Sequence, residues 1–308
     1  MVRSLPLRWL LPGLVAAAAF LVLSGPVVQA AEVLRWKFAK GDVLRYEVKQ
    51  NMKQNVEANG AKIEMLLDQT YDLSWTVEDV DSQQNARVAL RFERIRFKMS
   101  SAALNFEFDS DNAENEPDNP VFKPVAQSMK AMLNVRFSFR VDPLGNLSEM
   151  KGLEELKKLL PGGAGSQFFS EDSIEQTASQ GFVRFSPEPI GQGQGWQKRY
   201  DLQMPQLGKI TGEENYTLAG NDALDVRECL RIVSRSDVEI APEKNGVLAK
   251  AGATFDIDPI ETTYYFDNQT GRLLKSQASQ QMQIGLNVGT AEIKMDVTVR
   301  LIPEKTLR

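Results

Sequence analysis

Apolar side chains occupy alternate positions over unusually long stretches of this chain. The clearest case runs from residue 63 to residue 77, where most of the intervening positions are polar. A period of two predicts a strand with one apolar and one solvated face, as in an antiparallel sheet covered on one side. A strand of this length spans about 50 Å, so it must twist and curve. Its apolar positions are Ile63, Met65, Leu67, Tyr71, Leu73, Trp75 and Val77.

The same alternation recurs in three other parts of the chain. It runs through residues 44–56 and again through residues 135–141. Near the C-terminus, the apolar residues are even-numbered over residues 274–288, up to Gly289-Thr290, and odd-numbered over residues 293–301. A change of parity across a turn predicts a long closing hairpin.

The alternation slips by one position between residues 88 and 99. Its apolar residues are even-numbered up to Phe92 and odd-numbered from Ile95 onward. One extra residue near Glu93-Arg94 returns both sets to the same face, so we expect a β-bulge there.

Helical spacing is confined to the middle of the chain. Asp118-Asn119-Pro120 resembles a helix start, and the apolar residues from Phe122 to Leu133 follow at helical spacing. A second short helix is predicted over 151–160, and a weaker one near Ser170. The predicted fold class is therefore α+β: long, curved antiparallel strands, arranged as a duplicated meander or half-barrel, with a central helical insertion.

Two halves of the chain resemble each other in the order of their short motifs. The pattern divides the chain into a signal peptide (1–30), a first β-unit (31–119), a helical insertion with one β-hairpin (120–190) and a second β-unit (191–308). The second unit is expected to continue the same sheet. Duplication and the general likeness of all meanders both explain the matches, which pair 41–47 with 195–201, 68–73 with 213–218, and 139–147 with 264–273.

Residues 1–30 have the features of an export signal. Arg3 and Arg8 precede an apolar stretch over residues 9–23, and the small residues Val28 and Ala30 fit cleavage before Ala31. The stretch is shorter than the about 20 residues that span a bilayer, although a retained N-terminal anchor is the alternative. We therefore expect a periplasmic or secreted protein, with no transmembrane span after cleavage near Ala30.

Composition excludes several kinds of chemistry. The chain has 308 residues, no histidine and one cysteine, Cys229. This removes histidine-based catalysis, histidine-ligated zinc, internal disulfides and CxxC redox motifs. With 36 basic and 41 acidic residues there is no electrostatic basis for binding nucleic acid. No cofactor and no metal ion are expected.

Turn-and-strand motifs after the signal carry a family resemblance. They are Trp36-Lys37-Phe38, Gly41-Asp42 and Leu44-Arg45-Tyr46, followed later by Pro187-Glu188-Pro189-Ile190 and Gly195-Trp196. Together they resemble uncharacterised families of exported bacterial proteins that are domains of unknown function. The expected architecture is similar, by analogy, to periplasmic lipoprotein-carrier half-barrels. None of these motifs carries chemistry, and a shared fold does not imply a shared function.

Several charged clusters have both a functional and a structural interpretation. The basic cluster Arg87, Arg91, Arg94, Arg96 and Lys98 can meet anionic headgroups or glycans, or face acidic residues across the sheet. The acidic loop from Asp109 to Asp118 lacks the EF-hand spacing and is expected to be solvated rather than to bind calcium. The glycines at 191, 193 and 195 lack the lysine and the strand of a phosphate-binding loop.

Two further candidates are a carboxylate pair and the single thiol. Asp256, Asp258 and Glu261 lie close together in sequence and are candidates for a general acid and base in a hydrolase without histidine. Cys229 lies in an apparent strand and is expected to be a buried, inert thiol.

Large apolar side chains on the inward faces suggest a binding groove. A strongly curved open sheet leaves a concave apolar surface, with the helix containing Phe122 and Met129 over it, whereas a closed sandwich buries the same residues in an ordinary core. The expected function is non-enzymatic binding of a lipid or another hydrophobic or amphipathic ligand. The alternatives are a fully packed structural module that contacts an envelope protein partner, and a carboxylate-only hydrolase. The groove residues are Met65, Trp75, Phe97, Phe122, Met129, Phe137, Phe139 and Met295.

Overall fold

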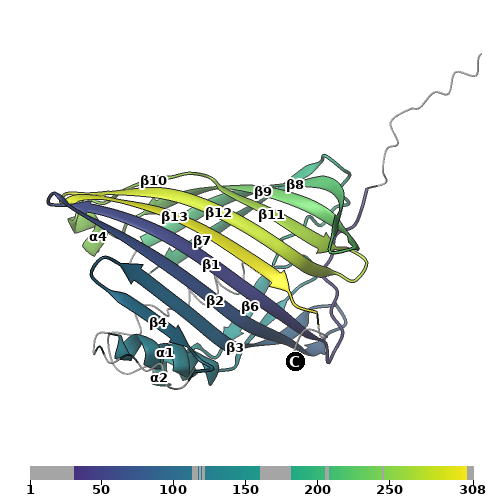
Figure 1. The fold of residues 1–308 in the computed structure, drawn as a ribbon. Coiled ribbons are helices and arrows are strands. Elements are labelled where there is room, and N and C mark those ends of the chain that lie inside the picture. Colours follow the sequence, from purple (N-terminus) through teal and green to yellow (C-terminus); the bar gives the residue numbers. More distant parts are fainter. Residues whose placement is uncertain are drawn as a thin grey trace, which may run out of the picture. The chain divides into compact units, whose positions relative to one another are not determined.

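The chain folds around one long antiparallel sheet. The computed structural model of the chain divides into two units, Met1–Ala30 and Ala31–Arg308. The structure describes residues 31–112, 117, 119, 122–159, 182–204, 208–244 and 246–303, all in the second unit. The predicted fold class is confirmed: the sheet is curved and open, its strands are antiparallel, and short helices lie in the middle of the chain (Figure 1).

Within the described residues the sheet has 13 strands. Eleven of them follow the order β6-β5-β3-β2-β1-β13-β12-β11-β9-β8-β7, while β4 pairs with β3 and β10 pairs with β12. The first half consists of β1 (Val43–Ala58), β2 (Ala61–Val80), β3 (Ala86–Ser101), β4 (Asn105–Asp109), β5 (Phe137–Val141) and β6 (Leu147–Lys151). The second half consists of β7 (Gly195–Met204), β8 (Gly208–Leu224), β9 (Arg227–Ala241), β10 (Thr254–Ile257), β11 (Ile260–Asp267), β12 (Arg272–Leu286) and β13 (Gly289–Leu301).

The strand predictions that rested on alternation are confirmed. The 63–77 stretch lies inside β2, and β12 and β13 form the closing hairpin, in which Leu286 pairs with Gly289. The bulge is also present, because Asp72 pairs with Arg94 whereas Leu73 pairs with Phe92. Glu93 is the extra residue, and it keeps the apolar residues on both sides of it on one face.

The helices begin later than the sequence signals suggested. Helix α1 is Lys123–Leu133 and has Pro124 in its first turn, where a missing N–H costs no helical hydrogen bond. Helix α2 is Leu153–Leu159, because Lys151 ends strand β6 and Gly152 follows at a φ of +103°. A third helix, α4, is Val247–Lys250, so the expectation that helices are confined to the middle of the chain was wrong. Asp118, Pro120 and the stretch near Ser170 lie outside the described residues.

Two extended segments fill one end of the sheet. The N-terminal strap (31–40) and the crossing strap (182–194) are joined by the backbone pairing of Glu32 with Ile190. Phe182 of the crossing strap stacks on Trp75 with ring centroids 4.5 Å apart, and Trp36 Nε1 donates to Val183 O at 3.0 Å. We call this the closed end, and the sheet face that the straps cover is the inner face.

Burial falls steadily along the inner face from the closed end to the other end. Tyr46 and Val48 on β1 are buried, whereas Met52 and Val56 on the same face are only half-buried. The far end carries the turns β1–β2, β3–β4 and β12–β13, and we call it the open end. Helix α1 packs beside β3 and β4, where Phe122 stacks on Phe106 at 4.6 Å. The straps thus fill only part of the concave side.

The matched motifs of the two halves fall on strands in equivalent positions. The 41–47 and 195–201 passages open β1 and β7, the first strand of each meander, and the second pair lies on β2 and β8. The third pair forms the turns β5–β6 and β11–β12. In these turns Asp142 Oδ1 accepts from the backbone N–H of Leu144, and Asp267 Oδ1 accepts from that of Gln269, at 2.9 Å each. This shared placement favours duplication.

The straps predict a test at Gly145, which lies in the β5–β6 turn at a φ of +85°. A Cβ atom there would overlap Val183 O and lie 2.9 Å from Trp36 Nε1. Gly145→Ala should lower the free energy of unfolding by at least about 3 kcal/mol in urea titrations. Gly41→Ala is the control: its φ is +91° with nothing within 4 Å, so it should lose only about 1–2 kcal/mol. Equal losses at both sites would contradict the packing described for the straps.

Candidate functional site

A cavity of about 380 Å³ lies on the inner face. It is lined by Leu147 of β6 and Tyr200 of β7, which are the strands at opposite ends of the sheet order, and by residues of β8, β9 and β11–β13. The sheet therefore curves around this cavity, and the inner face is its concave side. Phe182 and Arg184 of the crossing strap border the cavity from the filled, closed end.

Glu214 is the centre of the polar wall of the cavity. Its Oε1 accepts from Ser234 Oγ at 2.8 Å and from Tyr264 Oη at 3.2 Å. Its Oε2 accepts from Tyr216 Oη at 2.6 Å and from Arg184 at 2.9 Å. The Glu214 side chain is only 12% exposed, and four donors from three strands and one strap satisfy it.

Arg184 ties the crossing strap to this wall. Its guanidinium pairs with Glu214 and lies 5.2 Å from the centre of the Tyr200 ring, a cation–π arrangement. Its backbone oxygen accepts from Trp196 Nε1 at 2.7 Å, and Trp196 stacks on Tyr216 at 5.0 Å. Arg184 therefore joins the crossing strap to β7 and β8.

Burial keeps the tyrosine hydroxyls of this region protonated. Desolvation raises the pKa of Tyr216 and Tyr264 well above the ordinary value, and the neighbouring Glu214 charge raises both further. Desolvation also raises the pKa of Tyr200, and outside the cavity, on β2, it raises that of Tyr71 to about 12. The cavity therefore presents neutral hydroxyls across the physiological pH range.

The wall of the cavity on β12 and β13 is largely apolar. Its apolar residues are Ala278 on β12 and Met295, Val297 and Val299 on β13, and β12 also contributes the polar Ser276, Ser279 and Gln280. Met295 pairs across the sheet with Met52, which pairs with Leu67, and Leu67 pairs with Met99. This inner-face row, which we call the methionine row, extends the apolar wall from β13 to β3, and all of its members are half-buried.

The structure separates the eight predicted groove residues into two sets. Met65, Phe97 and Met295 are half-buried on the inner face, and Met295 lines the cavity. The remaining five side chains are buried in the core and offer little surface to a ligand. These five are Trp75, Phe122, Met129, Phe137 and Phe139. The eight therefore do not form one groove, because the straps and α1 cover most of the large aromatic side chains.

Sequence reasoning missed the polar wall, although a signal was present. Glu214 has the same parity as Tyr216 and Leu218, so the alternation places a carboxylate on the covered face of β8. Arg184 lies within the apolar run from Phe182 to Phe185, which is equally unusual. Charges at apolar-face positions are expensive unless paired, and here they pair with each other.

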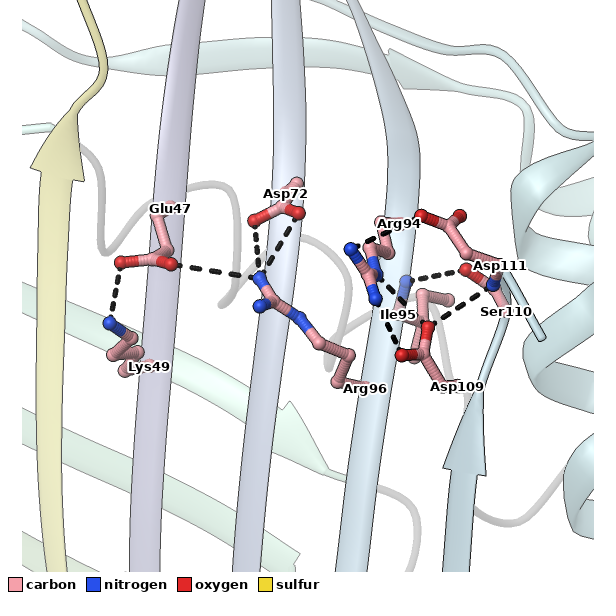
Figure 2. A network of polar contacts seen from close by, with 9 residues as sticks. All are labelled: Glu47, Lys49, Asp72, Arg94, Ile95, Arg96, Asp109, Ser110 and Asp111. Carbon is pink, nitrogen blue, oxygen red and sulfur yellow. Dashed lines mark hydrogen bonds and ion pairs between the residues drawn. The ribbon is translucent and has the colours of Figure 1, made fainter. Parts of the chain in front are cut away.

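The basic cluster on β3 forms ion pairs on the opposite, outer face of the sheet. Figure 2 shows Arg94 bound to Asp109 and Asp111, at 2.5 and 3.2 Å, and Arg96 bound to Asp72 at 2.9 Å. The hydrogen bonds from Arg94 lower the pKa of Asp109 despite partial desolvation. For Arg94 and Arg96 the structural interpretation of the cluster therefore holds, since both face acidic residues across the sheet.

The other sequence candidates do not converge on the cavity. Asp256, Asp258 and Glu261 are all exposed, and Glu261 borders a polar hollow of about 740 Å³ on the outer face. Cys229 is buried, and desolvation raises the pKa of its thiol. In the described part of the chain, no cluster of acidic and thiol side chains has metal-binding geometry. The helices described there are too short or too polar to cross a membrane.

Comparison with known proteins finds distant likenesses to solved structures. No family model and no curated protein match the chain. A structure of lipovitellin with its lipid–protein interactions matches 87% of this chain at 10% identity and a TM-score of 0.49, and the chain spans 26% of its length. An exported protein with a YmcC-like fold from Bacteroides fragilis matches 89% of this chain and 100% of its own length at 9% identity, with a TM-score of 0.29. Since these TM-scores lie below 0.5, the function proposed below rests on the residues of this chain alone.

The buried pair predicts strong energetic coupling between Arg184 and Glu214. Glu214→Gln should cost about 2–4 kcal/mol of unfolding free energy, because it leaves a largely buried guanidinium without its counter-charge. Adding Arg184→Met to that variant should cost less than the sum of the single losses, with a coupling of at least about 1 kcal/mol in a double-mutant cycle. The neighbouring pair Arg199–Glu213, 78% and 36% exposed, is the control and should couple by less than about 1 kcal/mol. Equal coupling in the two pairs would contradict this account.

The tyrosines predict loss of stability at alkaline pH. In the unfolded chain they ionise near pH 10, whereas burial raises the pKa of Tyr46, Tyr71, Tyr200, Tyr216 and Tyr264 in the fold. Above pH 10 the unfolded state therefore releases protons that the folded state retains, and stability falls as pH rises. Absorbance at about 295 nm should show most tyrosines still protonated at about pH 11, followed by ionisation together with unfolding. Ionisation of all tyrosines near pH 10 without unfolding would contradict the burial of these hydroxyls.

Proposed function

We propose that this protein binds an amphipathic ligand on the inner face of its sheet and does not catalyse a reaction. The observation that carries the proposal is the cavity of about 380 Å³, with an apolar wall on β12–β13 and a hydrogen-bonding wall around Glu214. Its volume falls in the range of small-molecule sites, about 300–1,000 Å³. Two walls of opposite polarity suit a molecule with an apolar chain and a polar group.

The methionine row gives the apolar part of such a ligand a path beyond the cavity. Met295 belongs to both, and Met52, Leu67 and Met99 follow it in register across four strands. Methionine side chains are flexible and polarisable, so they fit apolar chains of irregular conformation. The row is half-buried, and a bound chain would remove it from water.

The polar wall favours an uncharged polar group on the ligand. Arg184 and Glu214 are the charged residues among those that line the cavity in the described structure, and they neutralise each other. A carboxylate or phosphate would have to compete with Glu214 for the guanidinium. The hydroxyls of Tyr200 and Ser236, 3.2 Å apart, are better matched to an ester, amide or hydroxyl group.

Export through the signal over residues 1–30 would place this binding activity in the cell envelope or outside the cell. The rival function is a structural module that contacts another envelope protein. The core positions of Trp75, Phe137 and Phe139 favour it, since these side chains are packed against one another rather than available to a ligand. The two functions differ in whether the cavity takes up an amphipathic molecule.

A pair of adjacent substitutions tests the proposal. Ala278 lines the cavity, whereas Gln277, the residue before it on β12, is exposed on the outer face. Ala278→Phe should fill the cavity and weaken binding of a fluorescent acyl-chain probe by at least about tenfold, and Gln277→Phe should leave binding unchanged. Native mass spectrometry of the purified wild-type protein should also show a bound amphipathic molecule. Absence of probe binding to the wild type, or equal effects of both variants, would favour the structural module.

A further inference from the structure

Exposed apolar side chains gather at the open end of the sheet. Ile63 is 56% exposed, Leu66 41%, Leu104 43% and Val288 57%, and they belong to three different hairpins. Only three other large apolar side chains of the described residues are exposed to this degree: Val33, Leu159 and Val226. Isolated exposed apolar residues are ordinary, but four at one end of a sheet mark a contact surface.

The hairpin turns that carry these side chains are held next to one another. The backbone N–H of Asn59 in the β1–β2 turn donates to Val288 O in the β12–β13 turn at 3.2 Å. Ser101 at the start of the β3–β4 turn pairs with Met65 of β2, and its N–H donates to Leu104 O at 2.9 Å. The backbone N–H of Asn287 donates to Ala251 O at 2.9 Å. The exposed side chains therefore lie on a fixed edge, which we call the tip edge.

The tip edge is apolar on both faces of the sheet. Ile63 continues the inner-face parity of Met65 and Leu67, whereas Leu66 lies at an outer-face position that is otherwise polar in this strand. A protein partner docked against one face would cover only one of these two side chains. A surrounding apolar medium reaches both.

Three ion pairs lie beside the tip edge. Glu57 pairs with Lys62 at 3.1 Å, Glu64 with Lys53 at 2.6 Å, and Glu292 with Lys294 at 3.1 Å. These residues add no net negative charge, although the whole chain has a formal charge of −5. The lysine stems can also extend along an apolar surface while their ammonium groups stay in water.

We propose that the tip edge enters the interfacial region of a lipid bilayer. The tip edge lies at the open end, where the straps do not fill the inner face. A bilayer in contact with the tip edge would therefore lie next to the methionine row. This part of the proposal rests on the proposed function: an amphipathic ligand would pass between bilayer and inner face without crossing water. Membrane contact itself does not require that a ligand be bound.

Flotation with phosphatidylcholine vesicles, with and without phosphatidylglycerol, tests the membrane contact. The variant Ile63→Thr/Leu66→Thr/Val288→Ser changes only exposed side chains and should float at least about tenfold less than wild type. Val226→Asn is the matched control, since Val226 is fully exposed in the β8–β9 turn at the closed end and has a positive φ of 66° that asparagine tolerates. It should float like the wild type. The wild type and both variants have the same N-terminal residues, so a difference in flotation between them comes from the substituted side chains.

A second measurement locates the contact. Tryptophan at position 288 (Val288→Trp) should shift its emission to the blue when vesicles are added and be quenched by brominated lipid, and Val226→Trp should not. Failure of the wild type to float, or an equal loss in Val226→Asn, would overturn the proposal. The proposal would also be overturned if sedimentation showed that the wild type forms dimers, that the tip variant does not, and that neither of them binds vesicles. Probe binding measured without vesicles should be unchanged in the tip variant, so loss of the cavity function and loss of membrane contact can be told apart.

Discussion

The packing of the two straps against the closed end is the constraint on which the rest of the structure depends. A strongly curved sheet encloses a volume on its concave side, and apolar side chains that face this volume must be covered. Trp36, Trp75 and Phe182 cover it at one end through direct ring contacts. Arg184 of the crossing strap pairs with Glu214 of β8 at the border of this filling, and beyond that pair the inner face is only partly covered. The position of the cavity is thus set by where the aromatic filling ends.

Sequence alternation predicted the strands well because each long strand has one covered and one solvated face. The bulge could be placed near Glu93-Arg94, since a single insertion is the simplest way to keep both halves of β3 in phase, and the strand register then identifies Glu93 as the extra residue. The straps could not be predicted in this way. They have no period, and their buried positions depend on which strands they cross rather than on their own pattern. For this reason the sequence assigned Phe137 and Phe139 to an open groove, whereas the straps and neighbouring rings bury them.

The candidate site was harder to predict than the fold because it combines residues that are far apart in the chain. Arg184 and Glu214 are brought together by a strap and a strand, and Tyr264 joins them from a different part of the sheet. The parity of Glu214 marks it as a residue on the covered face, but parity alone does not name its partner. Methionines 52 and 99 also escaped attention as a set, since only the strand register aligns them with Met295.

The place of the first strand in the sheet has a consequence for biogenesis. β1 lies in the middle of the strand order and pairs with β13, the last strand, from Tyr46 with Leu301 to Ala58 with Gly289. A chain that is made from its N-terminus can form each meander as it emerges, but β1 keeps an unpaired edge until β13 arrives. Unpaired edges recruit other strands, and pairings between distant segments form slowly. The interval between the emergence of these two strands is therefore when a newly made molecule is most exposed to misassembly with its neighbours.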